Sequence, residues 1–87
     1  MDLTAFERHH IQLNLPLLIL KGRKGLLACG YLNVETFNKT GEVAAIVTGV
    51  KTFEDMASAA VAKVSQAGDQ LGLRVGMTGA QALELIR

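Results

Sequence analysis

The sequence predicts an α/β fold in a single compact domain, residues 1–87: an N-terminal antiparallel β meander, then a βαβ unit and a C-terminal helix. Three observations predict it. Strand-like apolar patterns fill the first 32 residues. A β-branched segment follows at residues 43–48, and apolar residues recur at helical spacing after residue 52. The chain therefore divides into a β region, residues 1–32, and an α/β region, residues 33–87.

The first region reads as three antiparallel strands. Residues 6–15 alternate, with Ile11, Leu13 and Leu15 on one face, which predicts a half-buried strand. Pro16 starts a second strand, residues 17–20, because proline cannot donate within a ladder. A charged, glycine-containing turn at residues 21–25 then leads into a central strand at residues 26–32.

The second region begins with a short helix that Asn33 caps and residues 39–41 end. A buried strand at residues 43–48 follows. Thr52, three residues before Asp55, starts the clearest predicted helix, residues 53–71, which Gly72 stops.

The last part of the chain completes the predicted βαβ unit. Residues 73–75 form a short strand, parallel to residues 43–48. Thr78 and Gln81 form a capping box that starts the final helix. Both threonine-capped helices then begin at the carboxyl edge of the sheet, where open α/β sheets usually bind ligands.

Composition limits the class of protein. The chain is 49% hydrophobic with few aromatic residues, so the core is aliphatic, and the apolar surface exceeds what a small monomer covers. We therefore expect a homo-oligomer. The net charge of +1 argues against binding to nucleic acid or to an anionic membrane. Lys21, Arg23 and Lys24 are interpreted as a solvated turn, since no aromatic residues interleave with them.

Localisation is expected to be cytoplasmic. The one cysteine cannot form an intramolecular disulfide, which fits a reducing compartment. The N-terminus has no signal-peptide pattern, and the longest apolar runs are too short to span a bilayer. We therefore expect a soluble, untargeted protein.

Three segments in order carry a family resemblance: residues 25–33 (GLLACGYLN), 49–56 (GVKTFEDM) and 71–83 (LGLRVGMTGAQAL). They resemble the YunC-like domain family of bacteria and archaea, a domain of unknown function. The resemblance implies a small α/β domain whose N-terminal β region is a tetramerisation element. It implies no activity.

Cys29 is the weak catalytic candidate. On the predicted strand it shares a face with Leu27 and Tyr31, which favours an inert core residue that alkylates slowly. The alternative is a nucleophile whose thiol is activated by a cation or a helix N-terminus. His9 and His10 point to opposite faces of a strand, so no metal site is predicted, and no cofactor is expected.

The ligand-binding candidates are Lys51, Thr52, Thr78 and Gly79. Two helix N-termini with free backbone donors, together with Lys51 and Arg74, could hold an anion or a carboxylate. Residues 49–52 lack the upstream glycine of a phosphate loop. Ordinary helix capping explains both junctions without a ligand, and this is the favoured interpretation.

Two hypotheses follow. The first is a non-catalytic, homo-oligomeric scaffold or binding module assembled through the meander. The second is a small-molecule-binding protein or enzyme that uses the two helix N-termini, with Cys29 as its candidate reactive group. The sequence does not decide whether there is a reaction, and the ligand is unknown.

Overall fold

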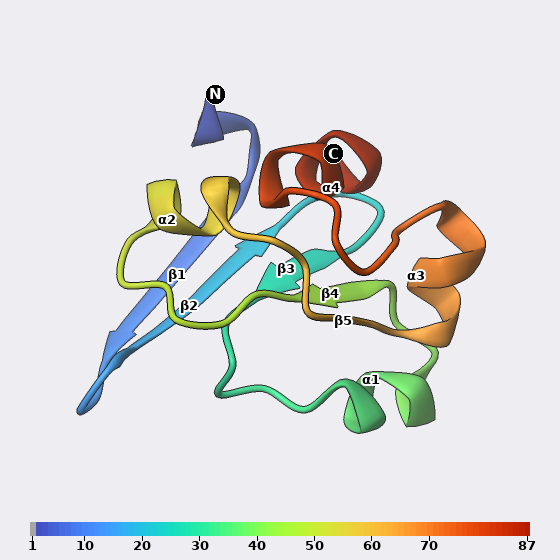
Figure 1. Cartoon of the computed structure of the whole chain (residues 1–87), viewed down its shortest axis with the longest axis horizontal. Coiled ribbons are helices and arrows are strands. Elements are labelled where there is room, and N and C mark those ends of the chain that lie inside the picture. Colours follow the sequence, from blue (N-terminus) through green and yellow to red (C-terminus); the bar gives the residue numbers. More distant parts are fainter. Residues whose placement is uncertain (1) are drawn as a thin grey trace.

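A computed structural model describes residues 2–87 and confirms the predicted fold class. One five-stranded mixed sheet in the order β1-β2-β3-β4-β5 is packed against helices on both faces (Figure 1). The elements in chain order are a 3-10 turn η1 (Leu3–Ala5), β1 (Glu7–Gln12), β2 (Pro16–Lys21), β3 (Leu26–Ala28), α1 (Val34–Thr40), β4 (Ala44–Ile46), α2 (Phe53–Ser58), β5 (Lys63–Val64), α3 (Gln66–Leu71) and α4 (Gly79–Ile86).

The meander is confirmed. β1 pairs antiparallel with β2, and β2 pairs antiparallel with β3. β3 then pairs parallel with β4, because α1 carries the chain back to the starting edge of the sheet. β5 closes the far side of β4 as an antiparallel edge strand.

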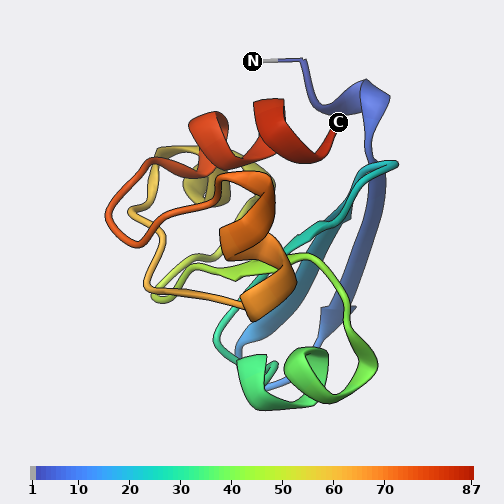
Figure 2. The same cartoon turned by 90° about the vertical axis from the view of Figure 1, so that its right-hand side faces the viewer.

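The central strands are covered on both faces. Leu27 and Ala45 face a core that contains Met56 of α2 and Leu83 of α4. The next residues along each strand, Ala28 and Ile46, face the opposite way and pack with residues of α1. Figure 2 shows the two helix layers, with α4 and α1 on opposite sides of the sheet. The predicted central strand is thus present and covered on both faces, although β3 ends at Ala28 rather than at residue 32.

The predicted helix of residues 53–71 is wrong. The structure has α2, an extended segment containing β5, and α3 in its place. The extended segment pairs with β4: the N–H of Ala62 donates to the carbonyl of Ile46 at 2.7 Å, and that of Ser65 to Ala44 at 2.9 Å. A continuous helix would leave that edge of β4 without partners, and unpaired buried backbone groups are costly.

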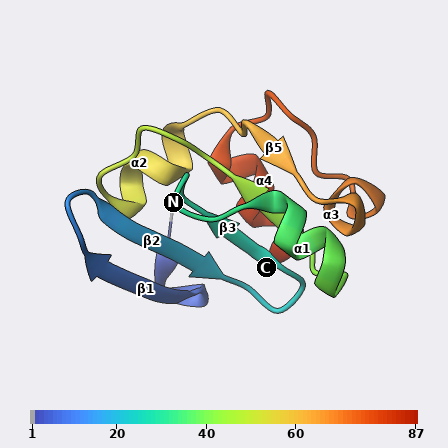
Figure 3. The same cartoon turned by 90° about the horizontal axis from the view of Figure 1, so that it is seen from below.

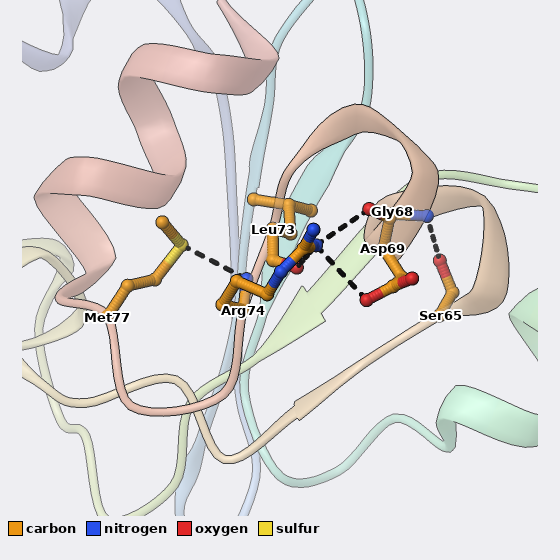
Figure 4. Close-up of polar contacts among 6 residues, drawn as sticks. All are labelled: Ser65, Gly68, Asp69, Leu73, Arg74 and Met77. Atoms are coloured by element: carbon orange, nitrogen blue, oxygen red, sulfur yellow. Dashed lines mark hydrogen bonds and ion pairs between the residues drawn. The ribbon is translucent and has the colours of Figure 1, made fainter.

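Ser65 holds this junction together. Its hydroxyl is buried, accepts from the N–H groups of Ala44 (3.0 Å) and Gly68 (3.0 Å), and donates to the carbonyl of Glu42 (2.7 Å). The bond to Gly68 caps α3 (Figure 4). One side chain thus starts a helix and fixes it to the strand beside it.

The predicted strand at residues 73–75 is also absent, since these residues form a loop and turn after Gly72. The parallel pair of the domain is instead β3 and β4, so the βαβ unit consists of β3, α1 and β4. The predicted βαβ unit of residues 43–75 is therefore wrong, although a different βαβ unit lies earlier in the chain. Among residues 2–87, no helix is both long and apolar enough to cross a bilayer.

The β1–β2 ribbon, residues 7–21, is more exposed than the sequence predicts. Every residue of β1 is exposed, and Ile11, Leu13 and Leu15 retain 55%, 47% and 60% of their accessible surface. The half-buried first strand is therefore wrong for the isolated chain. Figure 3 shows the reason: α1 lies over the other end of the sheet and leaves β1 and β2 uncovered on that side.

Candidate functional site

An open pocket of about 440 Å³ lies where the parallel strands β3 and β4 end. The carboxyl ends of parallel strands are the usual ligand position in α/β sheets, because the loops that follow them diverge there. The turn after β3 and the loop before α2 supply most of the lining, and the turn of the β1–β2 ribbon supplies the rest. The lining residues are Leu15, Pro16, Cys29, Gly30, Tyr31, Gly49, Val50 and Lys51.

Cys29 lies inside this pocket but is almost fully enclosed. Its residue is 4% exposed, and its Sγ accepts a hydrogen bond from the N–H of Leu18 at 3.3 Å. Its own N–H donates to the carbonyl of Leu18 at 3.1 Å. Cys29 is thus bonded to Leu18 of β2 through both its thiol and its backbone, and it is a buried residue that lines the pocket.

Tyr31 does not share the buried face of Cys29, contrary to the prediction. β3 ends at Ala28, and the turn that follows it directs the Tyr31 side chain outward, where the residue is 46% exposed. The Tyr31 hydroxyl accepts a hydrogen bond from the N–H of Leu15 at 3.2 Å. This contact joins the turn after β3 to the turn of the β1–β2 ribbon and forms one wall of the pocket.

Lys51 and Thr52 lie at the start of α2. The Thr52 hydroxyl accepts from the N–H of Asp55 at 3.0 Å, as predicted for an N-cap. The Asp55 carboxylate accepts in return from the N–H of Lys51 at 3.0 Å, one residue before the cap. In the described chain, residues 2–87, the Lys51 ammonium takes part in no ion pair.

Thr78 and Gly79 lie elsewhere. Thr78 and Gln81 form the predicted capping box, and the N–H of Gly79 donates to the carbonyl of Ala59 at 2.8 Å. Ala59 follows the last residue of α2, whereas Thr52 precedes its first residue. The structure therefore places the two threonine-capped helix starts at opposite ends of α2. They do not form one site.

Arg74 has a structural role in α3 (Figure 4). Its guanidinium donates to the carbonyls of Asp69 (2.7 Å) and Leu73 (2.7 Å) and pairs with the Asp69 carboxylate at 3.1 Å. The backbone N–H of Arg74 donates to the Met77 sulfur at 3.4 Å. Cations at a helix C-terminus satisfy its free carbonyls, so Arg74 closes α3 and lies outside the pocket.

The histidines point to opposite faces of β1, as predicted. His9 lies 3.5 Å from the Glu7 carboxylate, and the His10 ring meets Phe53 of α2 edge to face. Among residues 2–87, no three His, Cys, Asp or Glu side chains gather closely enough to hold one metal ion.

Comparison with known proteins places this geometry in a family. The model of a domain of unknown function, DUF1805, matches residues 28–86, which include the turn after β3, the loop before α2 and all four helices. The chain belongs to the DUF1805 family. This membership confirms the resemblance to the YunC-like domain.

Two similar proteins illustrate the match. The uncharacterized protein YunC of Bacillus subtilis is 36% identical over 63 residues, which is 68% of this chain and 62% of YunC. The crystal structure of a protein of unknown function, TA1206 from Thermoplasma acidophilum, is 36% identical and superposes with a TM-score of 0.83 over 94% of this chain and 93% of that one. The shared fold therefore includes most of the β1–β2 ribbon.

Sequence reasoning grouped Cys29 and Lys51 in its second hypothesis, and both line the pocket, but it missed Tyr31 and Leu15 as pocket residues. A signal was present. Two apolar segments flank the helix that Asn33 caps, and the connection is long enough for a crossover between parallel strands. That arrangement predicts a ligand position after each of these strands.

Proposed function

We propose that this domain is a non-catalytic homo-oligomer, assembled through the β1–β2 ribbon, that serves as a scaffold or binding module. The exposed side chains of Ile11, Leu13 and Leu15 carry the proposal. They lie on or next to one edge strand, within an otherwise well-buried small domain. Burying such a side chain contributes about 1.5–3 kcal/mol.

The edge position of β1 supports the same conclusion. β1 is the first strand in the sheet order, so its outer side has no partner in the described chain. Edge strands present unpaired N–H and C=O groups that pair readily with another chain. The YunC-like resemblance implies a tetramerisation element in this region, and we propose a tetramer. The one thiol, which is free and buried, fits a cytoplasmic location.

Sedimentation and native mass spectrometry test this assembly. We expect the natural chain to form tetramers and Ile11→Lys to form smaller species, because the substitution places a charge in the interface. The matched control is Val75→Lys: Val75 is also exposed, at 64%, but lies in the turn after α3. A monomeric natural chain, or equal dissociation by the control, would refute the proposal.

A second candidate function is small-molecule binding. One observation favours it: the pocket contains both Lys51, which takes part in no ion pair within residues 2–87, and the candidate reactive residue Cys29. Native mass spectrometry of freshly purified protein would then show a mass excess per subunit. Lys51→Gln should lose that mass, whereas Thr78→Ala should keep it because Thr78 is a helix cap outside the pocket.

A further inference from the structure

We propose that the pocket after β3 and β4 binds a small monocarboxylate with an apolar body, its carboxylate held by Lys51 and its body packed against the wall that Leu15 and Tyr31 form. This inference rests on the second candidate function, small-molecule binding. The pocket lies within one chain, so binding does not require assembly, although Leu15 lies both on the ribbon and in the pocket.

The lining determines the body of the ligand. Leu15, Pro16 and Val50 contribute aliphatic surface, and the Tyr31 ring adds an aromatic wall fixed by its hydrogen bond to Leu15. Small-molecule sites are mostly apolar with a few polar groups that set orientation. A ligand without an apolar body would leave this surface in water.

The charge of the lining determines the head group. Lys51 is the one charged residue among those that line the pocket, and it has no ion-pair partner in residues 2–87. The nearest fixed anion on its own segment is Asp55, whose carboxylate bonds to the Lys51 N–H. Lys51 is a single cation, and the Asp55 carboxylate is already close to its segment. The site therefore favours a monoanion over a phosphate or a nucleotide, which would bring more negative charge than Lys51 can balance.

Gly49 leaves room for the head group. Gly49 has a φ of 71°, a conformation that glycine adopts without strain, and no atom lies within 4 Å of where its Cβ would be. Gly30 also lines the pocket, on the turn that follows Cys29, but a Cβ there would lie 3.3 Å from the Thr48 side chain. The open space is therefore at Gly49, two residues before Lys51.

The experiment compares 4-phenylbutyrate with 4-phenylbutan-1-ol, which has the same body without the charge. Each is titrated into ¹⁵N-labelled natural chain, and the amide signals of Gly30, Gly49 and Lys51 are followed. We expect both to shift these signals, with the carboxylate binding on the order of five-fold tighter, the strength of an exposed ion pair. The carboxylate should also slow alkylation of Cys29.

Two variants isolate the charge. Lys51→Gln should make the two probes equal in affinity and leave the alcohol unchanged. Lys24→Gln is the matched control, because Lys24 is an exposed lysine in the turn before β3, outside the pocket. It should keep the five-fold preference.

Three results would overturn the proposal: no shift of these amides at millimolar probe, equal affinity of both probes for the natural chain, or an unchanged preference in Lys51→Gln. Repeating the titration with Ile11→Lys separates this failure from that of assembly, since Ile11 does not line the pocket. Retained binding in a smaller species upholds the site. Loss of probe binding only in the smaller Ile11→Lys species would overturn the claim that binding does not require assembly.

Discussion

Ser65 shows how much of this fold depends on one side chain. It is the buried polar residue that ties β4 to α3, with three hydrogen bonds to the backbone. Ser65→Ala removes the acceptor of two N–H groups and the donor to one carbonyl. We expect the free energy of unfolding to fall by about 2–4 kcal/mol, because buried groups left without partners cost about 1–3 kcal/mol each.

Denaturant titration measures this loss. Ser58→Ala is the control, since Ser58 is exposed at the end of α2 and should change the free energy of unfolding by less than about 0.5 kcal/mol. Equal effects of the two substitutions would mean that the Ser65 hydrogen bonds add nothing to stability.

Cys29 should react slowly in the native state. Its thiol is nearly enclosed and bonded to the N–H of Leu18, so a reagent must wait for local opening. We expect a disulfide reagent to label it over hours in buffer and within seconds in denaturant. Stoichiometric labelling of native protein within minutes would show that the pocket gives direct access to the sulfur.

At this scale the sequence predicted local chemistry well. Asn33, Thr52 and Thr78 cap helices as expected, and Gly72 ends one, because capping depends on residues a few positions apart. The position of Tyr31 and Leu15 beside Cys29 and Lys51 was not predicted. It depends on which strands become parallel neighbours, and that is decided by contacts far apart in sequence.

At the scale of elements, residues 53–71 show where periodicity misleads. The alanine-rich middle of this segment fits a helix, and its apolar spacing continues through both real helices. Pairing with β4 outweighs that preference, since propensity is worth only tenths of a kcal/mol per residue. No local sequence pattern indicates that this edge of β4 needs a strand partner.

Gly79 tests the packing of α4 on α2. A Cβ at this position would overlap the carbonyl of Met56, which is backbone and cannot rotate away. We expect Gly79→Ala to lower the free energy of unfolding by about 3 kcal/mol, the upper range for overpacking. The effect comes from helix contact, which explains the glycine without any ligand.

Thermal denaturation measures this loss, and Gly41→Ala is the matched control variant. Gly41 is the C-cap of α1, whereas Gly79 is the first residue of α4. Gly41 has a φ of 77°, and no atom lies within 4 Å of an added Cβ. Only the left-handed backbone is then penalised, by about 1 kcal/mol. A smaller loss for Gly79→Ala than for Gly41→Ala would argue against close contact of α2 and α4.

At the scale of the whole molecule, the proposed assembly has a thermodynamic signature. If folding and association are linked, the Tm of the natural chain rises with protein concentration, because association stabilises only the folded state. Ile11→Lys should have a lower Tm with little dependence on concentration. Scanning calorimetry over a hundred-fold range of concentration measures both, and a constant Tm in the natural chain would contradict the proposal.

The architecture was predictable to the level of its class. The meander follows from alternation and from Pro16, and the final helix from its capping box. The parallel pair was expected in the wrong place because residues 53–71 were interpreted as the crossover, although α1 between β3 and β4 is the connection that the chain uses. Exposure of the ribbon could not be predicted, since alternation shows only that one face is apolar and not what covers it.

The hydrogen bond from the Leu15 N–H to the Tyr31 hydroxyl has a consequence for both proposals. It joins the exposed ribbon to the wall of the pocket, so Leu15 belongs to both surfaces. Coupling between two binding events is reciprocal: a carboxylate that tightens association must itself bind more tightly to the associated form, by the same factor. The fraction of subunits with bound ligand would then rise with the concentration of the protein.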